Sequence, residues 1–185
     1  MALSGSAVKV IEPSPCLANS CCERGIDVVE KFLEDVENSD LPEGRRAFVS
    51  FELFEHLHDP ELFLKQLLEL MNSGDLFIFT TLSGTGIDIQ ALWEDSKSVS
   101  PPHHLNFLNP HSVKILLKRV GLQVLEVTTP GKLDIDILSN SRKLIKDRFL
   151  KTFLTYATDD EKETWQQMIS DSGWSSHMMI CCQQP

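Results

Sequence analysis

The chain has 185 residues and a net charge of −10, with 42% hydrophobic and 24% charged residues. This length favours one domain, and the composition is ordinary for a soluble globular protein. We expect no nucleic-acid partner, because a phosphate backbone selects basic surfaces, and no membrane span, because no apolar run approaches the roughly 20 residues that a span needs.

The five cysteines form a poor disulfide framework. Their number is odd, and two adjacent pairs occur, at Cys21-Cys22 and Cys181-Cys182. A metal site built from them and Cys16 is an alternative, but no C-x2-C spacing supports it. We therefore expect reduced thiols, a cytoplasmic location and no bound metal.

The first part of the chain predicts a strand, a helix and a second strand. The apolar run Ala7–Ile11 ends at Glu12-Pro13-Ser14-Pro15, where proline cannot continue a central strand. Pro15 suits the first turn of a helix, which Gly25 would end. Ile26–Val29 is the next expected strand, and Lys31–Val36 is a loop or a helical turn.

The centre of the sequence is the block AFVSFELFEHLHDPELFLKQLLELMNSGDLFIFTT, at residues 47–81. It predicts an apolar strand, an acidic loop, a helix that begins at Asp59-Pro60 and a second strand at Leu76–Thr80. The loop Glu52–Asp59 holds three carboxylates and two histidines. Ligands of open α/β sheets bind at the carboxyl ends of strands, so this loop is the first place to look for a function.

The second half continues the alternation of helices and strands. Leu82–Pro102 is a long connection that we expect to be a lid or a disordered segment. The remaining expected elements are a helix between Asn109-Pro110 and Gly121, a strand at Leu122–Val127, helices at Leu144–Phe153 and Asp160–Ile169, and a last strand at Ser176–Cys182. This order implies an α/β fold with a mainly parallel sheet and helices on both faces.

Two candidate residue sets remain ambiguous from position alone. Glu12 follows a strand and could accept hydrogen bonds from ribose hydroxyls, or it could be a solvated carboxylate. Glu55-His56 could act as an acid–base pair, or His56 could hydrogen-bond backbone instead. Of the adjacent His103 and His104, only one is expected to face a pocket. A metal pair of His56 and His104 has no ligand spacing to support it.

Three stretches resemble class I S-adenosylmethionine-dependent methyltransferases, namely EPSP after the first strand, the central block, and PPHHLNFLNPHSVKILLKRVGLQVLEVTTPGKLDIDIL. The similarity is greatest to the small-molecule branch related to ubiquinone-biosynthesis and sugar methyltransferases. The resemblance implies a Rossmann-like sheet of seven strands in the order 3-2-1-4-5-7-6, with strand 7 antiparallel. It also implies S-adenosylmethionine as the cofactor and a small molecule as the methyl acceptor.

The resemblance also assigns roles to particular residues. Glu12 matches the acidic residue that holds the ribose hydroxyls, and Leu33 and Glu34 match the position near the adenine. Phe51 and Glu52 match the strand end beside the methionine part of the cofactor. Glu55, His56 and His104 match positions around the acceptor pocket, where His56 or His104 could serve as a general base.

One feature of the family is not found in the sequence. A glycine-rich turn of the type GxGxG should follow a strand before EPSP, and Met1–Ser6 is too short to supply both. We therefore expect residues 1–185 to form a single methyltransferase-like domain, N-terminally truncated relative to the family and without its first, central strand. The neighbouring strands could then pair directly, accept a strand from another chain, or pack poorly.

Two functions follow from these expectations. One is S-adenosylmethionine-dependent methyl transfer to a small-molecule acceptor. The alternative is a non-catalytic methyltransferase-like fragment or binding module, with weak or no cofactor binding. An unpaired sheet edge would also allow self-association.

Overall fold

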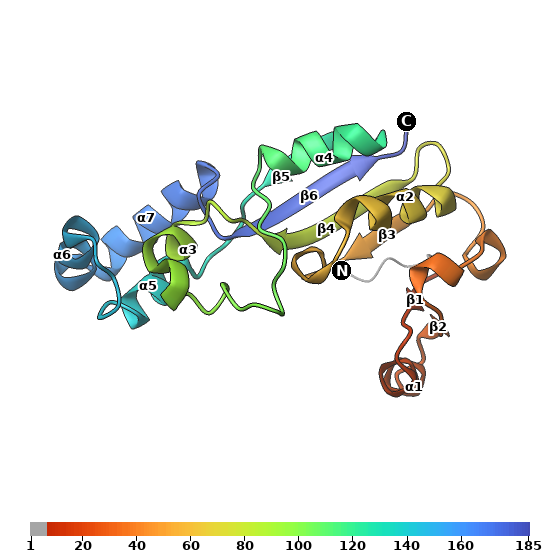
Figure 1. Cartoon of the computed structure of the whole chain (residues 1–185), viewed down its shortest axis with the longest axis horizontal. Coiled ribbons are helices and arrows are strands. Elements are labelled where there is room, and N and C mark those ends of the chain that lie inside the picture. The colour runs from red at the N-terminus through yellow and green to blue at the C-terminus, as the bar shows by residue number, and fades with distance from the viewer. Residues whose placement is uncertain (1–6) are drawn as a thin grey trace.

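Residues 7–185 are described by a computed structural model, so the expectation for Met1–Ser6 lies outside the described residues. The protein is elongated, with a twisted sheet in the middle, a helical lobe at one end and a small β–α–β unit that projects near the other (Figure 1).

The projecting unit is formed by the three elements expected at the start of the chain. They are β1 (Lys9–Ile11), α1 (Pro15–Glu23) and β2 (Asp27–Val29). β1 and β2 form a parallel two-stranded sheet of their own. The unit is attached to the rest through a small apolar cluster of Val29, Val36 and Leu70.

The main sheet has four strands in the order β3-β4-β6-β5. Their bounds are Ala47–Ser50 for β3, Leu76–Leu82 for β4, Gln123–Thr128 for β5 and His177–Gln183 for β6. β3 and β4 are parallel, and β6 is antiparallel to both of its neighbours. The orders β2-β1 and β3-β4-β6-β5 reproduce the expected order 3-2-1-4-5-7-6 except for strand 1.

No strand among residues 7–185 lies between β1 and β3, and these two strands do not pair with each other. Direct pairing, one of the three expected arrangements, is therefore not found. The edge of β3 that faces away from β4 has no strand partner in the described part of the chain.

Two helices cover one face of the main sheet, α2 (Pro60–Leu70) and α4 (Ser112–Val120). The start of α2 is as predicted, because the Asp59 carboxylate accepts a hydrogen bond from the Leu62 amide and Pro60 occupies the first turn. The apolar side of α2 is buried at Leu64 and Leu67, which face the main core, and at Leu70, which faces the cluster under the projecting unit. Leu62, by contrast, is 51% exposed.

The expected long connection Leu82–Pro102 is not structureless. It contains α3 (Ile87–Leu92) and a short 3-10 turn at Trp93–Asp95. α3 packs in the helical lobe with α5 (Asp134–Asn140), α6 (Arg148–Tyr156) and α7 (Asp159–Asp171). Short helices such as α3 and α5 are stabilised by this packing rather than by their own propensity, which is why the sequence pattern did not reveal them.

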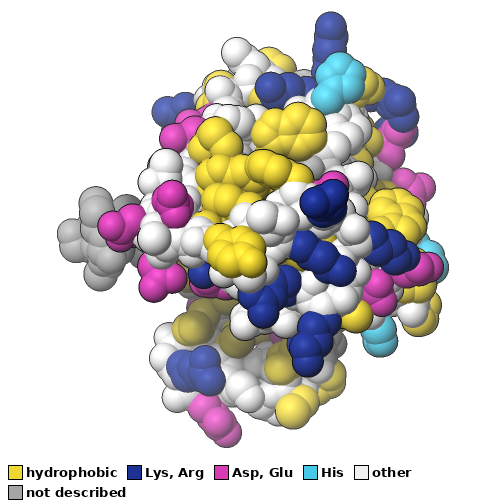
Figure 2. All heavy atoms as spheres, turned by 90° about the vertical axis from the view of Figure 1, so that its left-hand side faces the viewer, with side chains coloured by type: hydrophobic (Ala, Val, Ile, Leu, Met, Phe, Trp, Pro, Cys, Tyr) yellow, Lys and Arg dark blue, Asp and Glu magenta, His cyan; other side chains and the backbone are white. Residues whose placement is uncertain are grey.

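Figure 2 views the helical lobe end-on and shows apolar side chains gathered on its surface beside Lys and Arg side chains. The large apolar side chains that the lobe exposes include Phe149, Tyr156 and Met168. No helix of the described residues combines the length and the apolar character that crossing a bilayer requires.

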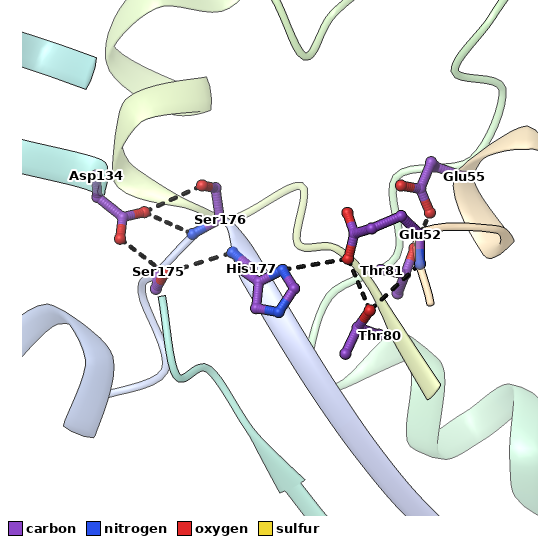
Figure 3. Close-up of polar contacts among 8 residues, drawn as sticks. All are labelled: Glu52, Glu55, Thr80, Thr81, Asp134, Ser175, Ser176 and His177. Atoms are coloured by element: carbon purple, nitrogen blue, oxygen red, sulfur yellow. Dashed lines mark hydrogen bonds and ion pairs between the residues drawn. The ribbon is translucent and has the colours of Figure 1, made fainter. Parts of the chain in front are cut away.

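A buried carboxylate joins the helical lobe to the sheet. Asp134, at the start of α5, is 2% exposed and accepts hydrogen bonds from both the amide and the hydroxyl of Ser176, at 2.7 and 3.1 Å. It also accepts from the Ser175 hydroxyl at 2.7 Å (Figure 3). The side-chain amide of Gln166 donates to it as well, at 2.7 Å. These contacts fix the residues that immediately precede β6.

Asp88 of α3 is a second buried carboxylate at this junction, and it accepts fewer hydrogen bonds than Asp134 does. It is 1% exposed, and its Oδ1 atom has no hydrogen-bond partner within residues 7–185. Burial raises the pKa of Asp88 above its usual value, and hydrogen bonding to Ser176 opposes this while the charge of Asp134 adds to it. The ionised form of Asp88 is therefore disfavoured by the fold.

We expect Asp88→Asn to raise the melting temperature by a few degrees at pH 7. A carboxyl whose folded-state pKa is raised contributes its full stability below the unfolded-state pKa, and that stability is lost as the pH rises through the folded-state pKa. The gain should therefore shrink as the pH falls towards the usual aspartate pKa. Thermal melts of both proteins at several pH values test this, and an equal gain at every pH would contradict it.

Candidate functional site

The candidate site lies where β3 and β4 end. Glu52 follows β3 with a φ of 49°, a left-handed conformation that non-glycine residues rarely adopt. Its amide donates to the Thr80 carbonyl at 3.2 Å, and its carboxylate accepts from the Thr80 hydroxyl at 2.7 Å. Conformations of this kind are held in place by their surroundings and cluster at functional sites.

Glu55 lies three residues further on, in the 3-10 turn Phe54–His56. It is only 2% exposed, and one of its carboxylate oxygens accepts a hydrogen bond from the Thr81 hydroxyl at 2.9 Å (Figure 3). The turn is anchored by Phe54, which is fully buried and stacks on Phe79 with ring centroids 4.2 Å apart. The last residues of β4 and the core thus position both carboxylates.

The structure brings His56 and His104 together, with ring centroids 4.8 Å apart. The segment that carries His104 is tied to the turn, since the Leu105 amide donates to the Glu55 carbonyl at 2.6 Å. The side-chain amide of Asn106 also donates to the carbonyls of Phe54 and Leu57. Asn106 is a positioning residue that sequence reasoning missed.

Hydrogen bonds to backbone carbonyls determine which nitrogen of the His56 and His104 rings carries the proton. Nδ1 of His56 lies 2.8 Å from the His103 carbonyl, and Nδ1 of His104 lies 2.7 Å from the Ser98 carbonyl. A carbonyl oxygen only accepts, so each Nδ1 carries the proton. In the neutral rings, Nε2 is then the atom with a free lone pair. His103 itself is exposed and contributes only its carbonyl, so His104 is the member of the adjacent pair whose ring lies against His56.

His177 is a further member of the site that the sequence did not single out. It opens β6, and its Nδ1 lies 3.3 Å from a carboxylate oxygen of Glu52 (Figure 3). Because β6 is antiparallel to β4, the start of β6 lies at the carboxyl end of β4. An antiparallel last strand was implied by the resemblance, and it could have pointed to this residue.

The other predicted residues lie apart from this group. Glu12 is half-buried at the end of β1, where one carboxylate oxygen accepts from the Ser14 amide at 2.8 Å. The second oxygen has no hydrogen-bond partner in the described chain. Leu33 is half-buried between the main core and the cluster under the projecting unit, whereas Glu34 is exposed and Phe51 is 67% exposed. No hydrogen bond or ion pair within residues 7–185 links Glu12 to Glu52.

A hollow of about 900 Å³ lies elsewhere, between the end of β5 and helices α5 and α7. None of the predicted site residues lines it. It therefore adds nothing to the assignment of the site at the ends of β3 and β4.

Comparisons with known proteins are consistent about the fold. Residues 1–127 match the family model described as a methyltransferase domain. No curated protein matches the sequence.

Several solved structures are similar. One is a SAM-dependent methyltransferase from Thermotoga maritima, with a TM-score of 0.57 and 14% identity over 96% of this chain and 73% of that one. A chain from the complex of the Haloferax volcanii Trm112 methyltransferase activator with a methyltransferase gives a TM-score of 0.61 and 14% identity, over 99% and 74%. A mycolic acid cyclopropane synthase complexed with SAH and CTAB gives 0.56 and 15% identity, over 95% and 69%.

Proposed function

The chain belongs to the methyltransferase domain family, whose reaction is methyl transfer from S-adenosylmethionine, and on that premise we propose that it methylates a small molecule at the ends of β3 and β4. The observation that carries the proposal is the convergence of Glu52, Glu55, His56 and His104 at this one edge of the sheet. Functional groups from separate segments that meet at a strand end form the usual crevice of an open α/β sheet.

The residues present fit parts of the cofactor. Glu12 would hold the ribose hydroxyls with its free carboxylate oxygen, Leu33 and Glu34 would border the adenine, and Phe51 and Glu52 would border the methionine. In the described residues, no strand with a glycine-rich turn lies in the space between β1 and β3. Residues 7–185 would therefore contact the cofactor only through its ribose, adenine and methionine parts. When bound, S-adenosylmethionine supplies a methyl group already activated by the sulfonium charge.

The chain's own task is then to orient the acceptor and to remove its proton. His56 and His104 each present an Nε2 lone pair, because backbone carbonyls hold their Nδ1 protons. Either Nε2 could accept the acceptor's proton as a general base. The hydroxyls of Thr80 and Thr81 hold the carboxylates of Glu52 and Glu55, which would border the bound acceptor.

We expect Glu12→Ala to weaken the binding of S-adenosylmethionine by about 10- to 100-fold, since hydrogen bonds to a charged group contribute about 1.5–3 kcal/mol. Calorimetric titration of the full chain with S-adenosylmethionine measures this. Glu23→Ala is the matched control, because Glu23 is an exposed carboxylate at the end of α1. Equal affinities of wild type and Glu12→Ala would remove Glu12 from the site, and no detectable binding by the wild type would overturn the proposed function.

We also propose a cytoplasmic location and an assembly that involves the free edge of β3. All five cysteines are free thiols, which supports a reducing compartment. Val49 and Phe51, beside that edge, are exposed apolar side chains, and an exposed strand edge favours association with another strand.

A further inference from the structure

We propose that Glu55, His56 and His104 form a binding site for one divalent transition-metal cation. One ligand atom from each residue can be chosen so that all three lie within 4.8 Å of one another. The sequence offered no ligand spacing for these residues, because His104 reaches the site through the contacts of Leu105 and Asn106 with the turn.

The imidazoles are oriented as metal ligands usually are. In metal sites, the histidine nitrogen that does not bind the metal donates its proton to a carbonyl or carboxylate, which fixes the ring and its tautomer. The His103 and Ser98 carbonyls do this for His56 and His104, at 2.8 and 2.7 Å. Both Nε2 atoms are thereby left as unprotonated ligands.

Glu55 supplies the third ligand and a reason for a cation to bind. Its side chain is buried, one oxygen is held by Thr81, and the other has no hydrogen-bond partner within residues 7–185. It also forms no ion pair with a Lys or Arg of the described chain. A negatively charged oxygen that no Lys or Arg neutralises favours a cation as its partner. A cation held by one nitrogen of each imidazole would be that partner.

The ligand set defines the class of cation. Two imidazole nitrogens and one carboxylate oxygen suit Zn²⁺, Mn²⁺, Fe²⁺ or Co²⁺, whereas Ca²⁺ and Mg²⁺ favour oxygen ligands. Three protein ligands leave coordination positions for water or for an acceptor oxygen. That last use rests on the proposed function, and while the metal is bound neither Nε2 acts as the general base. Metal binding itself does not depend on the proposed function.

Titration with Mn²⁺ tests the site directly, with free Mn²⁺ measured by its electron paramagnetic resonance signal. Mn²⁺ is chosen because it binds thiolates weakly, so Cys16, Cys21 and Cys22 do not compete. We expect one Mn²⁺ per chain, and we expect Glu55→Gln and His104→Gln to weaken binding at least about 10-fold. His103→Gln is the matched control, because its carbonyl remains, and it should bind as the wild type does.

Two results would overturn the site. One is the absence of Mn²⁺ and Zn²⁺ binding by the wild type up to millimolar concentrations. The other is equal metal binding by the wild type, Glu55→Gln and His104→Gln. Zn²⁺ binding that these two substitutions leave unchanged and that alkylation of the cysteines abolishes would belong to this second result, because the thiols would then be the ligands. Circular dichroism and S-adenosylmethionine titration of the same variants show whether they are folded, so a failed metal site is distinguishable from a failed proposed function.

Discussion

Asp134→Ala is expected to lower the free energy of unfolding by about 3 kcal/mol, because it leaves buried hydrogen-bond donors without an acceptor. The Ser176 amide and the Ser175 and Ser176 hydroxyls all donate to this carboxylate, and the three donors lie in the segment that leads into β6. The segment has little room to rearrange, since a Cβ atom on Gly86 would lie 2.3 Å from the Ser176 Cα.

Urea denaturation followed by circular dichroism measures this loss. Asp136→Ala is the matched control, because Asp136 lies in the same helix but is exposed, and it should change stability by less than about 0.5 kcal/mol. If the two variants were equally stable, Asp134 would not hold the helical lobe to the sheet.

Loss of the general base, which is His56 or His104, is expected to slow methyl transfer by about 10²- to 10⁴-fold, the range that general acid–base catalysis contributes. His56→Ala and His104→Ala each remove one of the two imidazoles that can place a ring nitrogen near the Glu55 carboxylate. The measurement is the rate of S-adenosylhomocysteine formation with an acceptor found by screening hydroxylated aromatic compounds and amines.

His103→Ala keeps the carbonyl that orients His56 and removes only an exposed ring, so its rate should match that of the wild type. Unchanged rates in both His56→Ala and His104→Ala would exclude these rings from the reaction. An equally slow His103→Ala would indicate that the loop, and not the two imidazoles, limits the rate.

Local chemistry made several elements predictable from the sequence. The strand-ending prolines after Glu12, the Asp59-Pro60 cap and the continuous apolar run of β4 each depend on neighbouring residues, and each appears where it was expected. The position of β6 between β4 and β5 followed from the family resemblance rather than from any local pattern.

Long-range contacts explain what the sequence did not show. α3 and α5 are stabilised by their shared apolar cluster, and the pairing of His56 with His104 depends on hydrogen bonds across about fifty residues of chain. The burial of Glu55 likewise results from Thr81 and the core beneath it. Residue spacing alone carries no signal for such contacts.

The place of β6 has a consequence for the order of folding during synthesis. β4 and β5 each pair with β6 and not with each other, although β6 is the last of the three to leave the ribosome. Until residues 177–183 emerge, both strands present an unpaired edge, and such edges are prone to aggregation. We infer that β4 and β5 stay open to misassociation until residues 177–183 have left the ribosome.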